Sequence, residues 1–155
     1  MTDQSASGKL APEQLDQLLR EPINARLGTV TPEGYPYVVP IWTEYDGRAV
    51  WLVSLARSRH AQNILANPKV SISIARDTSD LTRAVILGRA EAVQGPGPLN
   101  GRMLEVALSM CRRYTGADTD PYSAESKAWP RCLFRVIPEQ ITSWGGAVHH
   151  PRYRS

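Results

Sequence analysis

The chain has 155 residues, and 18 Lys and Arg against 15 Asp and Glu give a formal net charge of +3 at pH 7. Hydrophobic residues make up 42% and charged residues 21%, which is ordinary for one globular domain and excludes a disordered chain, a collagen-like chain and a coiled coil. The charge is too small to indicate nucleic-acid binding by itself, and no apolar run approaches the ~18 residues that span a membrane.

The domain boundaries and the compartment follow from simple features. The polar amino terminus has no signal-peptide core, which predicts a cytoplasmic protein with neither nucleic acid nor membrane as a partner. We expect flexible tails over residues 1–10 and 146–155 around one domain over residues 11–145. Cys111 and Cys132 lack CxxC spacing, and are predicted to be reduced, buried thiols rather than zinc ligands.

The first half of the chain predicts one helix and then strands. Pro12 is typical of a first helical position, and the helix ends before Pro22. Pro36 and Pro40 require their strand to lie at an edge or to contain a bulge. Short turns join the strands, which predicts a three-stranded meander. The three strands are expected over residues 25–31, 35–45 and 49–55.

The second half predicts two helices and three strands. Ser58 is the expected cap of a short helix that reaches Ala66. Strands are expected over residues 70–74, 82–94 and 133–137, the last prolonged by 141–144, with a helix over 99–114. Residues 95–101 are a plain linker rather than a dinucleotide fingerprint, because the third Gly falls one residue late and two prolines remove amides.

This order of elements favours an antiparallel barrel with helices filling its gaps, in a mostly-β or α+β fold. A doubly wound parallel sheet would need a helix after nearly every strand. The sequence contains no Ser/His/Asp set, P-loop or HExxH motif, so hydrolysis has no obvious machinery. His149 and His150 are interpreted as part of a mobile or dimer-packed tail rather than as a metal site.

A basic turn is the first candidate site. Arg57, Arg59 and His60 crowd the amino end of the short helix, where cations oppose the helix dipole. A bound phosphate would explain them, because helix amides, the Ser58 hydroxyl and guanidinium groups together suit an anion. The alternative is a solvated basic turn. Its expected ion-pair partners are Asp77, Asp80 or Glu44.

The second candidate is the segment Val39-Pro40-Ile41-Trp42. Pro40 leaves a strand carbonyl without a neighbouring ladder amide, and Trp42 offers a large flat face. Both features suit the edge of a planar heterocycle. The alternative for Trp42 is ordinary core packing at a corner of the barrel.

Together these segments resemble the pyridoxamine 5′-phosphate oxidase-like split-barrel family, and are most similar to its actinobacterial flavin- and deazaflavin-dependent oxidoreductases. The resemblance covers roughly residues 12–144 and rests on the order of several short motifs. These motifs are Ala25–Val30, the turn at Gly34, Val39–Trp42, Ser58–Ile64, Asn67–Ile72 and Gly88–Val93.

The resemblance implies an antiparallel six- or seven-stranded split β-barrel of the FMN-binding type with a few peripheral helices. It also implies a homodimer whose cleft holds FMN or the deazaflavin coenzyme (F-420). The residues implied for the cofactor phosphate are Arg57, Ser58, Arg59 and His60, with Asn63 behind them. Those implied for the ring are Pro40, Ile41, Trp42 and Ser54.

The function that the resemblance implies is hydride transfer between the cofactor and a small organic substrate, with no side chain required as acid or base. Several cations in one cleft favour the deazaflavin, whose phosphodiester and oligoglutamate tail are more anionic than FMN. Family proteins often have Lys at the position of His60. The histidine weakens a permanent charge there, so the cofactor is left open between the deazaflavin and FMN. The alternatives are a non-catalytic cofactor carrier, a haem-binding split-barrel protein, and a basic interaction domain without a cofactor.

Overall fold

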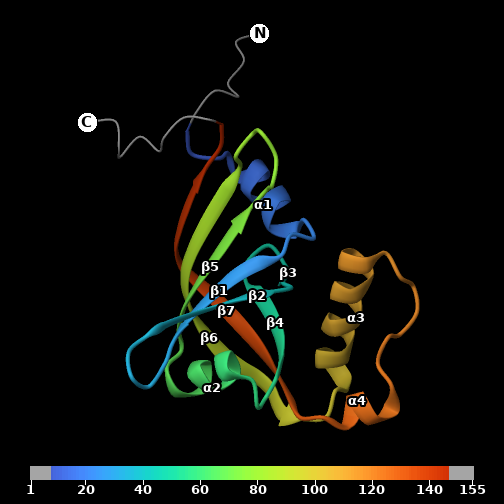
Figure 1. The fold of residues 1–155 in the computed structure, drawn as a ribbon. Helices are drawn as coiled ribbons and strands as arrows, with labels where there is room; N and C mark the ends of the chain where they lie inside the picture. Colours follow the sequence, from blue (N-terminus) through green and yellow to red (C-terminus); the bar gives the residue numbers. More distant parts are fainter. Residues whose placement is uncertain (1–7, 147–155) are drawn as a thin grey trace.

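The computed structural model describes residues 8–146, in which seven strands form one antiparallel sheet (Figure 1). The strand order is β2-β1-β5-β6-β7-β4-β3. The strands are β1 (Ala25–Val30), β2 (Pro36–Ile41), β3 (Glu44–Tyr45), β4 (Val50–Leu55), β5 (Lys69–Ala75), β6 (Arg83–Gly97) and β7 (Arg131–Trp144). The helices are α1 (Pro12–Arg20), α2 (Arg59–Ala66), α3 (Gly101–Thr115) and α4 (Ala124–Ala128). The expected split-barrel architecture is confirmed.

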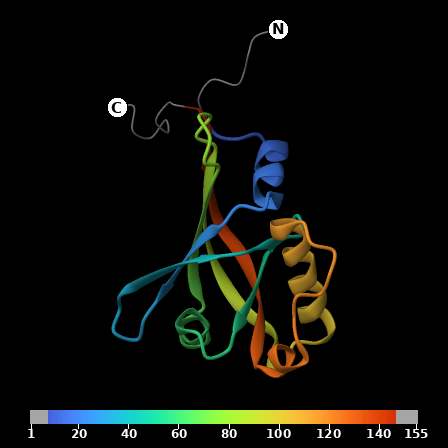
Figure 2. The ribbon, with the colours of Figure 1, turned by 45° about the vertical axis from the view of Figure 1, so that its right-hand side comes forward.

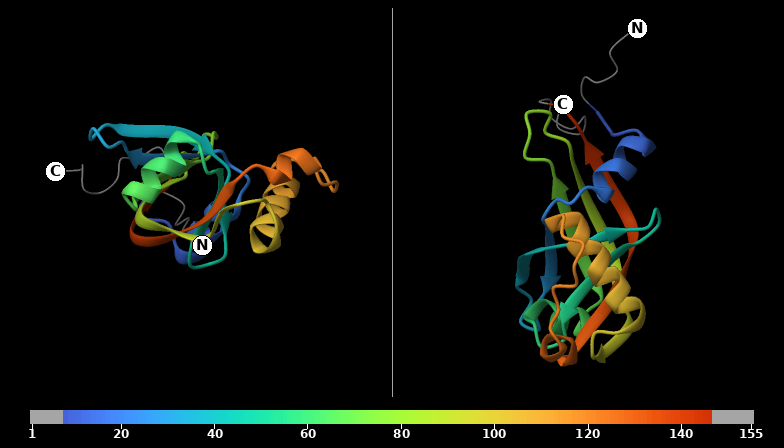
Figure 3. Two further views of the ribbon diagram at one scale, coloured as in Figure 1. Left: turned by 90° about the horizontal axis from the view of Figure 1, so that it is seen from below. Right: turned by 90° about the vertical axis from the view of Figure 1, so that its right-hand side faces the viewer.

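The predicted meander of the first three strands is wrong. β2 pairs with β1, but β4 pairs with β7, so β2 and β3 lie at opposite ends of the strand order although two residues separate them in the chain. The backbone amide of Thr43 donates to the Tyr114 hydroxyl at 3.1 Å instead of continuing a strand ladder. The expected strand over 35–45 therefore breaks at residues 42–43, and the sheet curls into a barrel (Figure 3).

The core fills the barrel. Successive side chains of each strand point alternately inward and outward, and the inward ones are the apolar residues of the core. In β5, Val70, Ile72 and Ile74 are buried while Ser71 and Ser73 are half-buried, as the alternating pattern predicts. β2 lies at an edge of the strand order, as its prolines require. Side chains with 0% exposure include Leu18, Leu27, Leu52, Phe134 and Val136.

The helices lie around the barrel (Figures 1 and 2). Ser58 caps α2 by accepting a hydrogen bond from the Ala61 amide at 3.3 Å, as expected. α3 packs beside β4, where Met103 and Ala107 bury Trp51 and Leu133 in a second apolar cluster. Among residues 8–146, no helix is long and apolar enough to cross a membrane.

The segment after β6 differs from the prediction at two points. The strand continues to Gly97, which pairs with Arg131, so only residues 98–100 of the linker expected over residues 95–101 lie between β6 and α3. The five-residue α4 was not predicted, because it is too short to show helical periodicity. Cys111 and Cys132 are both buried and free, as predicted. His149 and His150 lie outside the described residues.

Candidate functional site

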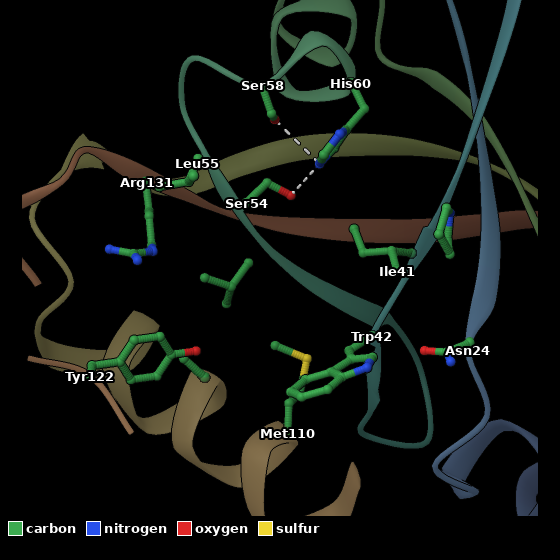
Figure 4. Close-up of a pocket in the computed structure, with 13 residues that line it drawn as sticks. Asn24, Ile41, Trp42, Ser54, Leu55, Ser58, His60, Met110, Tyr122 and Arg131 are labelled. Carbon is green, nitrogen blue, oxygen red and sulfur yellow. Dashed lines mark hydrogen bonds between the residues drawn. The ribbon is translucent and has the colours of Figure 1, made fainter. Parts of the chain in front are cut away.

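A cavity of about 550 Å³ opens between β4, the end of β2 and α3 (Figure 4). This volume lies in the range of small-molecule sites, about 300–1,000 Å³. Its lining combines apolar side chains with a few polar groups, which is the usual composition of a ligand site. The lining residues are Asn24, Pro40, Ile41, Trp42, Val53, Ser54, Leu55, Ser58, His60, Ala107, Met110, Tyr122 and Arg131.

One wall of the cavity is apolar. Pro40, Ile41 and Trp42 form it at the point where β2 ends, and Met110 of α3 lies next to Trp42 (Figure 4). The Trp42 ring stacks on Tyr114, with the centroids 4.8 Å apart and the planes 15° from parallel. Trp42 therefore packs at a barrel corner and also borders the cavity, so both sequence-based interpretations describe part of its environment.

Another part of the cavity is polar. The His60 Nε2 lies 2.9 Å from the Ser54 hydroxyl and 3.3 Å from the Ser58 hydroxyl. Burial lowers the pKa of the His60 imidazole, since desolvation penalises its charged form. A neutral imidazole between two hydroxyls can donate or accept a hydrogen bond, but it adds no permanent charge to the cavity.

Because His60 is held neutral, we expect the free energy of unfolding to fall as the pH drops below 6.5, the ordinary histidine value. The pKa is lower in the folded chain than in the unfolded one, so acid favours the unfolded chain, which takes up the proton more readily. His60→Gln should flatten this part of the profile. Urea unfolding of both proteins between about pH 5 and 8 measures the effect. If the free energy of unfolding changed with pH equally in both proteins, the prediction for His60 would be contradicted.

The predicted phosphate residues do not all reach the cavity. Ser58 and His60 line it. The guanidinium carbon of Arg57 instead lies 5.8 Å from the Trp129 ring centroid, and both residues line a second cavity of about 380 Å³. Arg59 pairs with Glu33 at 3.4 Å, and both side chains are more than half exposed (54% and 61%).

The other predicted features of the basic turn also have different surroundings. Asn63 is buried, and its amide donates to the Thr29 hydroxyl at 3.0 Å, so it ties α2 to β1. Of the acidic residues that the alternative interpretation named, Glu44 pairs with Arg113 and Asp80 with Arg76. The partner of Arg59 is instead Glu33, which that interpretation did not name.

The cation that does line the cavity is Arg131, which sequence reasoning missed. Arg131 begins β7 and is only 7% exposed. Tyr122 lies beside it, with the guanidinium carbon 5.4 Å from the ring centroid. Burial, with the neighbouring Cys111 thiol, raises the pKa of Tyr122 to about 12, so its hydroxyl stays protonated. An arginine at the start of a strand is usually exposed, so no signal in the sequence predicts that Arg131 is buried.

The comparisons with known proteins agree on one fold. A family model described as pyridoxamine 5′-phosphate oxidase matches residues 11–145. The structure of an F420 reductase is 26% identical, with a TM-score of 0.68 over 81% of this chain and 94% of the reductase. Rv2991 from Mycobacterium tuberculosis is 27% identical, with a TM-score of 0.71 over 88% of this chain and 85% of its own.

The haem storage protein HutZ from Vibrio cholerae is 24% identical, with a TM-score of 0.63 over 86% of this chain and 93% of HutZ. At this identity the likeness to HutZ shows the fold alone. No curated protein sequence matches the chain.

Proposed function

The chain belongs to the pyridoxamine 5′-phosphate oxidase family, and we propose that it is an oxidoreductase that uses the deazaflavin coenzyme or FMN. The observation that carries this proposal is the division of the cavity into an apolar wall, which includes the Trp42 ring, and a polar part with Ser54, Ser58 and His60. A fused planar ring needs apolar surface on its face and hydrogen-bonding groups at its rim. The haem storage protein HutZ has the same fold, so the fold alone does not give the function, and the proposal rests on the cavity of this chain.

The residues of the cavity fit such a cofactor. Ile41 and Trp42 would lie against the ring, while the hydroxyls of Ser54 and Ser58 can hydrogen-bond its polar edge. When bound, the cofactor supplies hydride transfer to or from a small organic substrate. The cavity walls orient the ring and keep water away from it. This division of labour agrees with the missing acid–base motifs.

The charges around the cavity favour the deazaflavin coenzyme over FMN. Arg131 lines the cavity, while Arg57 precedes α2 and Arg59 begins it, both outside the cavity. A phosphodiester with an oligoglutamate tail is long enough to leave the cavity and offers several negative charges to such cations. The F420 reductase among the similar structures supports the same choice.

Absorbance titrations test the proposed function. The purified protein is mixed separately with the deazaflavin coenzyme, FMN and haem. We expect the deazaflavin or FMN to bind, and its reduced form to be oxidised by at least one of a panel of small organic acceptors faster with the protein than without it. A haem spectrum alone would support a haem-binding protein, and cofactor binding without turnover of any acceptor in the panel would support a cofactor carrier. No binding of any of the three would contradict every cofactor function.

We also propose that the chain forms a homodimer with the cofactor at the interface. Leu87, Val93 and Ile137 are 44%, 44% and 43% exposed on β6 and β7, and a symmetric partner could cover these apolar side chains. Sedimentation should therefore give about twice the chain mass of 17.2 kDa. A monomer at micromolar concentration with cofactor bound would contradict both the dimer and a shared cofactor cleft.

A further inference from the structure

Arg131 is a buried cation without a counter-charge. It is 7% exposed, and among residues 8–146 no carboxylate lies within ion-pair distance of its guanidinium. Asp120, close by in the chain, bonds Lys127 and the Tyr122 amide instead. Burying a charge is unfavourable unless an opposite charge or several hydrogen bonds compensate it. Arg131 therefore needs compensation that carboxylates of the described chain do not provide.

The hydrogen bonds of Arg131 occupy only part of its guanidinium. Nη1 donates to the carbonyl oxygens of Ser126 and Trp129, and Nη2 donates to the Ser126 hydroxyl at 3.0 Å. A guanidinium has five N–H groups, so the Nε–H and one Nη2–H remain. Nε and Nη2 share one edge of the planar guanidinium, and two N–H groups on one edge can bind both oxygens of a carboxylate or phosphate.

The unused edge opens to the cavity. Among the described residues, no fully buried side-chain nitrogen or oxygen lacks a hydrogen-bond partner. The Arg131 Nε has no partner, so it is not fully enclosed, and Arg131 lines the cavity. Figure 4 shows the guanidinium on the same side of the cavity as Tyr122, away from Trp42 and Asn24.

Tyr122 supplies a second donor on the same side of the cavity (Figure 4). Its oxygen accepts a hydrogen bond from the Cys111 thiol at 3.6 Å, which leaves the phenolic proton without an acceptor in the described chain. In Figure 4 the hydroxyl points toward the interior of the cavity. The high pKa of Tyr122 keeps that proton in place at neutral pH.

We propose that Arg131 and Tyr122 form an oxyanion site in the cavity, which binds the carboxylate or phosphate of a ligand. The site is distinct from the Ser54–His60–Ser58 group. It deepens the proposed function and rests on it in assuming that the same cavity holds the cofactor. The oxyanion comes either from the substrate, which would then be an organic acid, or from the phosphate of the cofactor.

Two matched probes test the site in the protein without cofactor. Benzoate and benzamide have the same shape, but only benzoate carries a negative charge. By calorimetric titration, we expect benzoate to bind at least tenfold more tightly than benzamide. Equal affinities would overturn the proposal. The titration does not depend on any cofactor, so a failure of the proposed function would leave this result readable.

Variants show whether Arg131 causes the preference for benzoate over benzamide. Arg131→Gln should abolish it, and Arg131→Lys should weaken it because an ammonium cannot bind two oxygens along one edge. Arg112→Gln removes an equal charge from the exposed end of α3 and should leave the preference unchanged. A folded Arg131→Gln variant that still prefers benzoate would overturn the proposal. Because Arg131 also holds Ser126, near-ultraviolet circular dichroism checks the fold.

A variant with a smaller change keeps the test decisive if Arg131→Gln does not fold. Tyr122→Phe removes only the hydroxyl and should lower the affinity for benzoate severalfold, with little change for benzamide. An unchanged affinity for benzoate would overturn the role of Tyr122.

The source of the oxyanion is distinguished by adding cofactor. If the deazaflavin coenzyme or FMN displaces benzoate and loses affinity in Arg131→Gln, the site binds the cofactor phosphate. If benzoate binds beside the cofactor with unchanged affinity, the site binds a substrate acid. Both results support an oxyanion site at Arg131.

Discussion

Replacing Phe134 with Ala should lower the free energy of unfolding by about 3–5 kcal/mol, the usual loss for a buried Phe in a tightly packed core. Phe134 is 0% exposed and is the largest fully buried side chain. It lies in β7, where it pairs with Leu52 of β4 on one side and Ala92 of β6 on the other. The change would leave a cavity where three strands of the barrel meet, and the surrounding backbone cannot collapse to fill it.

Urea unfolding at fixed protein concentration measures this loss. The control is Leu65→Ala, because Leu65 lies on α2 and is 46% exposed. We expect the control to change the free energy of unfolding by about 0.5 kcal/mol or less, as surface substitutions usually do. Similar losses in both variants would mean that the barrel interior is not the core of the protein.

Replacing Trp42 should have the largest effect on cofactor binding. Aromatic stacking on a planar ring contributes about 1–3 kcal/mol, so Trp42→Ala should weaken binding by about 5- to 150-fold. All four tryptophans lie in the described chain, and Trp42 alone lines the main cavity. Trp51 is buried beneath Arg102, at 4.2 Å from the guanidinium carbon, and Trp129 lines the second cavity.

Fluorescence separates this role of Trp42 from a general loss of stability. Cofactor binding should quench tryptophan fluorescence in the wild-type protein, and Trp42→Phe should remove most of that quenching. Trp129→Phe is the matched control, since its ring borders the other cavity, and it should retain the quenching. If quenching survives in Trp42→Phe and disappears in Trp129→Phe, the cofactor occupies the second cavity instead.

Local signals in the sequence were enough to predict most elements of secondary structure. Ser58 before an amphipathic segment predicted the start of α2, and the alternation of Val70, Ile72 and Ile74 predicted which face of β5 is buried. The start of α2 and the buried face of β5 depend only on residues close together in the chain, the first through a side-chain cap and the second through a two-residue repeat. The prolines of β2 predicted an edge strand in the same way, because proline has no amide to donate.

Pro40, Ile41 and Trp42 were predicted as one candidate segment, because they are consecutive in the chain. Consecutive side chains of an extended segment alternate between its two faces, so the structure was needed to show that all three line one cavity. The grouping of these residues with Ser54 and His60 rested on family resemblance, and the structure brings all five to one cavity.

Only the tertiary structure decided which cations reach that cavity. Arg57 and Arg59 follow β4 directly, but the path of the turn directs them to Trp129 and Glu33. Arg131 reaches the cavity because β7 pairs with β4, with Leu55 opposite Arg131. Leu55 and Arg131 are 76 positions apart in the chain, and neither local propensity nor the charge pattern predicts their pairing. Local sequence thus determined most elements of secondary structure and the candidate residues of the apolar wall. Long-range strand pairing decided where the buried positive charge of Arg131 lies.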